Sequence, residues 1–334
     1  TKNKEYANNV FPYSQFPQEK ELKGEVIELD TALFRYPFRI RIEGDKAIVL
    51  DLHGSDYYGH LFQYPSFRYL SSFGRRGDSP LEMLSMENFR LHNHTLWTLD
   101  ANKSELTRLD FSSSGDSLLR EETVALDEDI LRPLDFAIYN DTTFVIPDYS
   151  GESRFLKVDC KGKLIEKIGT IPTTNKKALQ EARPALAQAW RSFLDYNSHN
   201  SVLATVTQLG EVVEIYNLKD STHVIRVGEY DEPEFKVSDG YGIPTGIMGF
   251  SDVQVTDDAI YAVFHGTSFK DIARQSGRLP DGGKYIYVFS LKGEPLCKYV
   301  LDHYIYGIWV DEVTKTIMAT DVNNDQPILK FSFG

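Results

Sequence analysis

The chain has only two cysteines, Cys160 and Cys297, and no apolar run near the ~18 residues that a membrane helix needs. Two cysteines are too few for a disulfide scaffold or a zinc cluster, so we expect free thiols or small packing residues. Basic residues are also scarce: 36 Lys and Arg stand against 49 Asp and Glu, a formal net charge of −13 at pH 7. Nucleic acid needs a basic surface, so this balance argues against it as a partner.

Several enzyme motifs are missing as well. The sequence contains no G-x-S-x-G elbow, no G-x-G-x-x-G loop and no Walker phosphate loop. Asp and Glu are abundant, so a glycosidase with paired carboxylates stays open. We therefore favour a non-catalytic protein, with an enzyme as the alternative: a lyase or hydrolase that acts on glycan or peptide at a channel mouth.

Aromatic residues are plentiful, with 20 Phe, 19 Tyr and 3 Trp. They occur with β-branched residues in short runs between Gly, Asn, Asp and Pro, which is the pattern of strands. One run, a strand that usually ends in Asp, recurs at intervals of about 50 residues. Its copies are AIVLD (47–51), LWTLD (96–100), FVIPD (144–148), VLATVT (202–207), IYAVFH (260–265) and IMATD (317–321). This period predicts an all-β, six-bladed propeller with four-stranded antiparallel blades.

The repeat also predicts the domain organisation. We expect an N-terminal extension over 1–21 and one propeller domain over 22–334. The expected blades lie at about 36–74, 87–125, 134–170, 187–229, 250–301 and 305–333. The last blade has only three strands of its own, so the run at 22–29 is expected to supply the fourth and close the ring. Such a closure hides two strand edges.

Three segments interrupt the strand pattern. The stretch 176–195 has helical spacing broken by Pro184, Ser268 is placed to open a short helix that Gly277 ends, and 79–82 resembles a helical turn. In a propeller, these connectors emerge on the same face as the loops between second and third strands. We expect any binding site on that loop-rich face.

Two parts of the chain carry a family resemblance. The connector GRRGDSPLEM (74–83) resembles the connector after the first blade in six-bladed propeller proteins of the Bacteroidetes, although Ser79 replaces a glycine and Met83 an aromatic residue. The segment from IYAVFHGT to TIMATD is similar to the TolB-like six-bladed propeller family. The resemblance implies an exported protein of the cell envelope, periplasmic or an outer-membrane lipoprotein, and it supplies no catalytic residues. The chain begins at Thr1 and not at Met, so we expect either a trimmed cytosolic chain or, as the resemblance implies, one from which a leader with any lipid anchor was removed.

The leading functional hypothesis is a monomeric binding or scaffold propeller that recognises a glycan, peptide or protein on its loop-rich face. Tyr and His side chains around a concave mouth can stack on such ligands and hydrogen-bond to them; packing at the rim is the alternative. The candidate ligand-binding residues are His53, Tyr57, Tyr58, Arg75, Arg76, Trp190, Tyr241, His265, His303 and Tyr304.

Acidic residues raise the question of a cation. Asp321, Asn323 and Asp325 have the alternate spacing of a calcium loop, but the later Gly and Glu of an EF-hand are absent. We favour a polar turn here and keep Ca²⁺ as the alternative; no other cofactor is expected. The Asp that ends four of the second strands is expected to cap the next turn, and a carboxylate ring holding a cation is the alternative. The tripeptide Arg76–Asp78 matches an integrin attachment motif, but a structural turn is the favoured interpretation.

Overall fold

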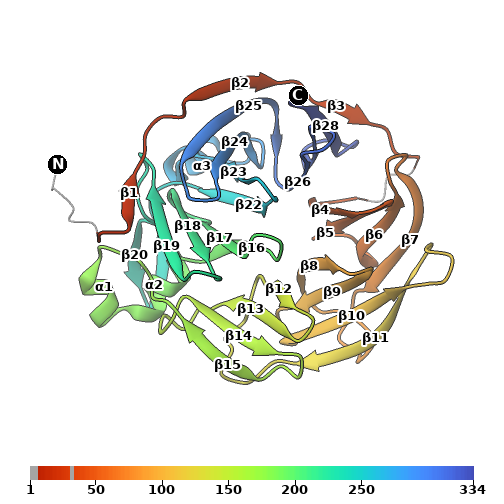
Figure 1. Cartoon of the computed structure of the whole chain (residues 1–334), viewed down its shortest axis with the longest axis horizontal. Helices are drawn as coiled ribbons and strands as arrows, with labels where there is room; N and C mark the ends of the chain where they lie inside the picture. Colours follow the sequence, from red (N-terminus) through yellow and green to blue (C-terminus); the bar gives the residue numbers. More distant parts are fainter. Residues whose placement is uncertain (1–6, 31–33) are drawn as a thin grey trace. The chain divides into compact units, whose positions relative to one another are not determined.

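The computed structural model describes residues 7–30 and 34–334 (Figure 1). Within them lie six sheets of four or five strands and one two-stranded hairpin. The prediction of an all-β six-bladed propeller is confirmed. The chain divides into two compact units: unit 1 comprises 1–21, 147–156 and 166–302, and unit 2 comprises 22–146, 157–165 and 303–334.

Unit 2 holds three complete four-stranded sheets; two are built from strands that follow one another in the chain, and the third takes its outer strand from the N-terminal part. The first contains β4 (Pro37–Glu43), β5 (Lys46–Asp51), β6 (Tyr57–Gln63) and β7 (Arg68–Arg75). The second contains β8 (Met86–His92), β9 (Thr95–Asp100), β10 (Glu105–Phe111) and β11 (Leu118–Ala125). The third contains β26 (Ile308–Asp311), β27 (Thr316–Thr320), β28 (Ile328–Ser332) and the N-terminal β3 (Glu25–Ile27).

Unit 1 holds two sheets that each carry an extra N-terminal strand, except that Leu22 of β2 and residues 303–305 of β25 are assigned to unit 2. One contains β16 (Ser192–Asn197), β17 (Val202–Thr207), β18 (Val212–Asn217), β19 (Thr222–Val227) and β1 (Val10–Pro12). The other contains β22 (Phe250–Val255), β23 (Ala259–Phe264), β24 (Gly283–Ser290), β25 (Pro295–Ile305) and β2 (Gln18–Leu22). The hairpin pairs β20 (Phe235–Ser238) with β21 (Tyr241–Pro244).

The residues of one further sheet are divided between the two units. Its strands are β12 (Ala137–Asn140), β13 (Thr143–Pro147), β14 (Phe155–Asp159) and β15 (Leu164–Ile168).

The strands differ in burial as their sequences predict. All six residues of β17 and all six of β23 are buried, so these two strands, which have only Thr205 and Thr207 as polar residues besides the Tyr261 hydroxyl, are covered on both faces. The outer strand β11 is mostly exposed or half-buried and carries charged residues, which discourage pairing with other chains.

The N-terminal segment closes the last blade. β3 pairs antiparallel with β28, with Ile27 opposite Ile328, and the side chain of Gln326 accepts the Leu29 N–H at 2.9 Å. This agrees with the closure expected from 22–29. The strands β1 and β2 were not expected, because 1–21 has no strand pattern: four of the five residues of β2 are exposed.

The helical segments follow their local signals. α1 (Lys176–Glu181) and α2 (Arg183–Ala189) are separate helices, with Pro184 in the first turn of α2. α3 (Phe269–Gln275) begins at Ser268, whose hydroxyl accepts the Asp271 N–H. Residues 79–82 form only a turn. No helix in the described ranges is long and apolar enough to span a membrane.

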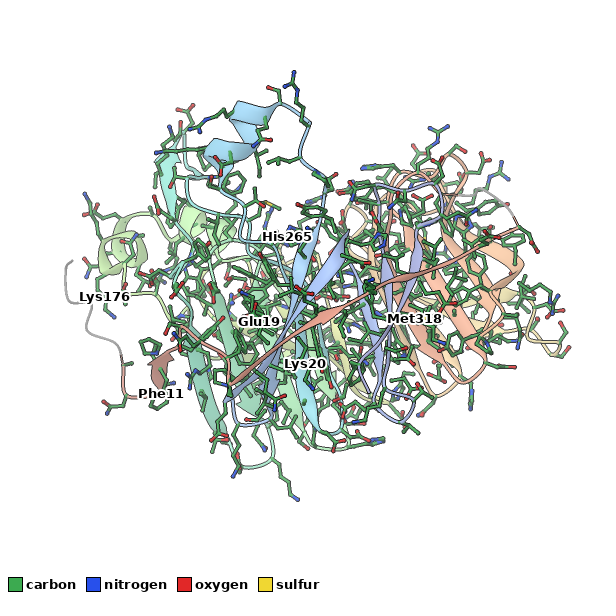
Figure 2. The ribbon with its side chains drawn as sticks, turned by 90° about the horizontal axis from the view of Figure 1, so that it is seen from above. Phe11, Glu19, Lys20, Lys176, His265 and Met318 are labelled. Atoms are coloured by element: carbon green, nitrogen blue, oxygen red, sulfur yellow. The ribbon has the colours of Figure 1, made fainter. Side chains whose placement is uncertain are left out.

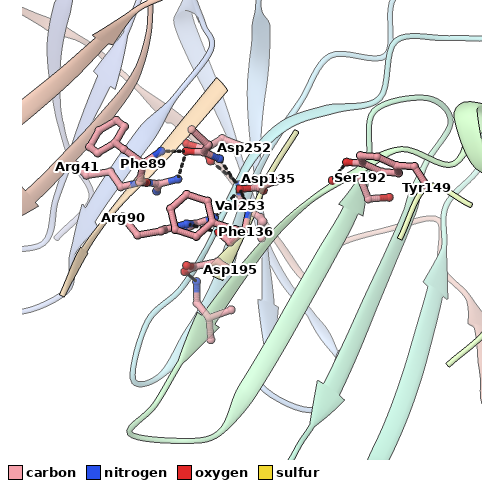
Figure 3. Close-up of polar contacts among 12 residues, drawn as sticks. Arg41, Phe89, Arg90, Asp135, Phe136, Tyr149, Ser192, Asp195, Asp252 and Val253 are labelled. Atoms are coloured by element: carbon pink, nitrogen blue, oxygen red, sulfur yellow. Dashed lines mark hydrogen bonds and ion pairs between the residues drawn. The ribbon is translucent and has the colours of Figure 1, made fainter. Parts of the chain in front are cut away.

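Buried arginines link the starts of three consecutive blades, whose first strands are β4, β8 and β12. Nε of Arg41 donates to the carbonyl of Phe89 at 2.8 Å, and Nε of Arg90 donates to the carbonyl of Phe136 at 2.7 Å (Figure 3). Arg90 also pairs with the buried carboxylate of Asp135 at 3.1 Å. These charge-assisted contacts fix one blade against the next and leave the guanidinium groups inside the protein.

Candidate functional site

The carboxylate of Asp51 organises the start of the first blade. Its Oδ1 accepts the main-chain N–H of Tyr36 at 2.7 Å and that of His53 at 3.2 Å, and its Oδ2 accepts the N–H of Arg35 at 2.9 Å. Asp51 is fully buried. One side chain therefore fixes two backbone segments that both carry an aromatic ring.

The other three aspartates that end second strands also hold backbone segments in place. Each accepts main-chain N–H groups of the turn that follows it, so the prediction of capping is confirmed. The donors are Asn102 and Lys103 for Asp100, Ser150 and Ser153 for Asp148, and Asn323 for Asp321. The N–H of Leu84, in the preceding connector, also reaches Asp100 at 2.7 Å. The carboxylates of all four aspartates, Asp51 included, are thus engaged by protein donors.

Three rings of unit 2 form a surface cluster that we call the aromatic arc: Tyr36, His53 and Tyr306. The ring centroid of Tyr36 lies 5.1 Å from that of His53 and 6.0 Å from that of Tyr306. Tyr306 packs edge-on against buried Phe38 at 5.8 Å. His53 is exposed and the two tyrosines are half-buried. The arc therefore presents apolar ring surface beside polar atoms, the combination that suits sugars and peptides.

Sequence reasoning named His53 but missed both tyrosines. Each lies just before the first strand of its blade: Tyr36 directly precedes β4 and Tyr306 stands two residues before β26. The two offsets differ and the other four blades carry no Tyr at either one, so the repeat pattern holds no signal for these tyrosines.

The connector after the first blade uses two predicted ligand residues internally. The guanidinium of Arg76 lies 3.7 Å from the ring centroid of Tyr58 and donates to the carbonyls of Asp51 and Leu52 at 3.0 and 2.6 Å. The Tyr58 hydroxyl donates to the carbonyl of Leu84, and Tyr58 is buried. These two residues hold the connector against the arc, and the Arg–Gly–Asp sequence is built into a structural turn although Asp78 is exposed.

The remaining candidates of unit 2 lie nearer the surface. Arg75 is exposed, with its Nε 3.9 Å from Glu82, and Tyr57 and Tyr304 are half-buried. Nδ1 of His303 lies 3.4 Å from the Asp321 carboxylate.

The proposed calcium loop is already filled by protein donors. Asp321 accepts bonds from the side chains of Asn323 and Asn324, while Asp325 is exposed. Among the described residues, no group of three or more His, Cys, Asp or Glu side chains is arranged to hold a metal ion.

The three predicted ligand-binding residues of unit 1 differ in their exposure to solvent. Tyr241, on the hairpin, is 63% exposed and remains available to a ligand. Trp190 was expected as a surface platform but is only 1% exposed, because it packs in the core under α2 with the guanidinium of Arg154 5.6 Å from its ring. Burial also lowers the pKa of His265 to about 4, so its imidazole is neutral at physiological pH.

Sequence reasoning also missed a buried ion pair in unit 1. Arg154 donates to Oε2 of Glu214 from Nε at 2.8 Å and from Nη2 at 2.7 Å, and both side chains are almost fully buried. Burial lowers the pKa of Arg154, but the Glu214 carboxylate outweighs it, so the pKa is raised overall. The hydroxyl of Tyr216 donates to the same carboxylate at 2.9 Å, and its ring stacks on His223. Every oxygen of Glu214 is paired, which marks a structural network.

Comparisons with known proteins agree with this architecture. A family model described as TolB-like 6-blade propeller-like matches residues 15–313. Among solved structures, a Bacteroides fragilis protein described as exported is 12% identical with a TM-score of 0.59, and the match covers 96% of this chain and 98% of that one. A DUF4221 family member from Bacteroides vulgatus is 10% identical with a TM-score of 0.58, covering 94% and 96%.

A third solved structure is an auxiliary nutrient binding protein from Bacteroides ovatus. It is 10% identical with a TM-score of 0.55, and the match covers 90% of this chain and 70% of that one. At these identities the likeness concerns the fold alone. No curated protein matches the sequence.

Proposed function

Because the chain belongs to the TolB-like 6-blade propeller-like family, we propose that it is an exported, non-catalytic binding protein that takes an oligosaccharide at the aromatic arc. Export is supported by the fold neighbour described as exported, and tethering at the cell envelope is part of the proposal. A binding role is supported by the fold neighbour described as an auxiliary nutrient binding protein, and the choice of an oligosaccharide rests on the ring surface of the arc. Fractionating the native cells and testing surface access with a protease checks the location.

The observation that carries the proposal is that Asp51 holds both Tyr36 and His53 through main-chain bonds. The backbone under these rings is thus fixed, and the rings also pack on one another, so they lose little entropy when a ligand stacks on them. The half-buried tyrosines supply ring faces for the C–H groups of a sugar, and the exposed imidazole of His53 supplies a hydrogen-bonding group.

A panel of oligosaccharides and peptides, screened by thermal shift, tests the proposal. A ligand at 100 times its dissociation constant stabilises the folded state by about 2.7 kcal/mol. The oligosaccharide that binds is then titrated into Tyr306→Ala and into the matched control Tyr241→Ala, which removes an exposed tyrosine from unit 1. We expect the first variant to lose at least about tenfold in affinity, or about 1.4 kcal/mol, and the second to bind normally. Peptide binding that Tyr306→Ala leaves intact would contradict the proposal.

A further inference from the structure

The connection between β23 and β24 is an insertion in the repeat. It spans 18 residues, 265–282, which we call the arm. The same connection in the other five blades is much shorter, over 52–56, 101–104, 148–154, 208–211 and 321–327. A connection as long as the arm is uncommon in a compact domain, where most have about 4–6 residues. Figure 2 labels His265, where the arm begins, and shows α3 standing clear of the strands of its sheet.

The helix of the arm is amphipathic, but its own chain does not cover its apolar side. Phe269, Ile272 and Ala273 lie on one side of α3, because residues three and four positions apart share a helix face. Phe269 is half-buried, Ala273 is exposed and Ile272 is 37% exposed. None of the seven residues of α3 is buried. An isolated helix this short is marginally stable in water, so α3 would gain stability by packing its apolar side on another molecule.

A second uncovered apolar surface lies on the hairpin of β20 and β21. Gly242 faces α2 so closely that a Cβ atom there would lie 2.6 Å from the carbonyl oxygen of Ala185. Side chains alternate along a strand, so the neighbouring Tyr241 and Ile243 lie on the opposite face, where they are 63% and 40% exposed. On the other strand of the hairpin, Val237 is 53% exposed. Apolar side chains grouped on an exposed face are typical of an interaction surface.

The segment that follows β21 connects the hairpin to the arm. The Thr245 N–H donates to the carbonyl of Glu234, just before β20, at 3.0 Å. The carbonyl of the next residue, Gly246, accepts the N–H of Phe269 in α3 at 3.0 Å. The hairpin and the arm are therefore neighbours within unit 1.

These two neighbours differ in charge. The segment 228–249, which contains the hairpin, has five Asp and Glu against one Lys, while the arm has three Lys and Arg against two Asp. The exposed side chains that give these signs are Glu229, Glu234 and Asp239 in the first segment and Lys270, Arg274 and Arg278 in the arm. One surface of unit 1 thus carries an acidic part and a basic part side by side, which makes it complementary in charge to a copy of itself.

We propose that two copies of the chain associate through this surface, with the arm of each copy packed on the hairpin of the other. A two-fold axis repeats every contact, so a surface that carries both charges can pair with itself. Tyr241, Ile243 and Ile272 form the apolar centre and the charged residues form the rim, the usual organisation of an interface. This dimer takes the place of the monomer expected from the sequence, and it uses no residue of the aromatic arc.

The charges of the hairpin favour a second copy over a membrane as the partner. A basic amphipathic helix can also bind an anionic lipid surface. Anionic headgroups would attract the arm but repel the exposed carboxylates of Glu229, Glu234 and Asp239 beside it. A second copy presents a basic arm to those carboxylates and an acidic hairpin to the arm.

Charge reversal tests the dimer by sedimentation equilibrium, at chain concentrations of about 1–100 µM. The arm variant carries Lys270→Glu and Arg274→Glu, and the hairpin variant carries Glu229→Lys and Glu234→Lys. Each variant alone brings like charges together at both copies of the contact, so we expect its dissociation constant to rise at least about tenfold. An equimolar mixture of the two restores opposite charges at both contacts and should form a heterodimer as readily as the unmodified chain dimerises.

The matched control carries Lys219→Glu and Lys292→Glu. Both lysines are exposed on turns of unit 1, and their reversal changes the net charge by the same amount as the arm variant. The control should dimerise like the unmodified chain. An unmodified chain that stays monomeric over the whole range would overturn the proposal, and so would a mixture that associates no better than its components. A monomeric chain that binds phosphatidylglycerol vesicles would assign the arm to a membrane and overturn it too.

Discussion

Asp51 accepts the main-chain N–H of Tyr36 at 2.7 Å, across 15 positions of sequence. The same oxygen accepts the N–H of His53, so a strand-ending residue that caps its own turn also sets the start of the blade. Asp100 repeats the arrangement with Leu84 in the next blade. Through its bond to the Tyr36 N–H, the Asp51 side chain that caps a local turn also positions the aromatic arc.

Replacing Asp51 tests its two roles, which are to cap its own turn and to position the aromatic arc. Asp51→Ala leaves three main-chain N–H groups without an acceptor, and each buried unpaired donor costs about 1–3 kcal/mol unless water reaches it. We expect urea unfolding to show a loss of at least that size. Calorimetry should also show weaker ligand binding, because the arc is no longer fixed.

The matched control is Asp100→Ala, which removes the equivalent cap from the second blade. We expect a similar loss of stability and unchanged binding. Equal losses of binding in both variants would mean that general loosening of the fold, and not positioning of the arc, controls the ligand.

The buried pair of Arg154 and Glu214 should dominate the stability of unit 1. Glu214→Ala leaves a buried guanidinium unpaired, which typically costs about 3–5 kcal/mol of unfolding free energy. The exposed pair of Lys167 and Glu152, at 2.6 Å, is the control: Glu152→Ala should cost less than about 1 kcal/mol. Denaturant unfolding measures both, and comparable losses would refute the distinction.

Acid should destabilise the protein through a buried histidine. Burial lowers the pKa of His60 from 6.5 to about 4, and its Nδ1 lies 2.7 Å from the Ser72 hydroxyl. The folded state holds the neutral ring, so its contribution is complete above pH 6.5 and is lost as the pH falls towards 4, by at most about 3 kcal/mol.

Urea unfolding at pH 4.5 and pH 7 measures this effect. His60→Gln should flatten the acid side of the stability profile, while His199→Gln, on an exposed turn, should leave it unchanged. An unaltered acid profile in His60→Gln would assign the loss to other groups.

Truncation tests the N-terminal strands one after another. A chain lacking 1–16 loses β1, Tyr13 and Phe16 but keeps β2 and β3, so it should be less stable yet remain dispersed. A chain lacking 1–29 also leaves the edge of β28 unpaired and should self-associate, since open sheet edges pair with other chains. Light scattering distinguishes the two, and a dispersed second truncation would contradict the closure.

The sequence predicts those features that depend on local chemistry or on the number of strands in each repeat. The missing strand of the last blade predicted β3, and the strand-ending Asp predicted the caps. β1 and β2 have no such signal, because they are held by the edges of distant strands and not by their own propensity. The burial of Arg154 has no local signal either, since its partner Glu214 stands 60 positions away.

The misreading of Trp190 has a similar cause. The helix before it, α2, buries Ala185, Leu186, Ala187 and Ala189, so burial extends around most of its circumference. Sequence periodicity finds one buried stripe on a helix and gives no warning of a helix covered on several sides. The Trp was therefore placed on the surface, where a connector would present it.

Hydroxyl-radical footprinting with the bound oligosaccharide tests the proposed site most directly. Oxidation of Tyr36, His53 and Tyr306 should fall when the ligand is present, while oxidation of Tyr241 should not change. Protection of Tyr241 with an unprotected aromatic arc would contradict the assignment and place recognition on the hairpin of unit 1.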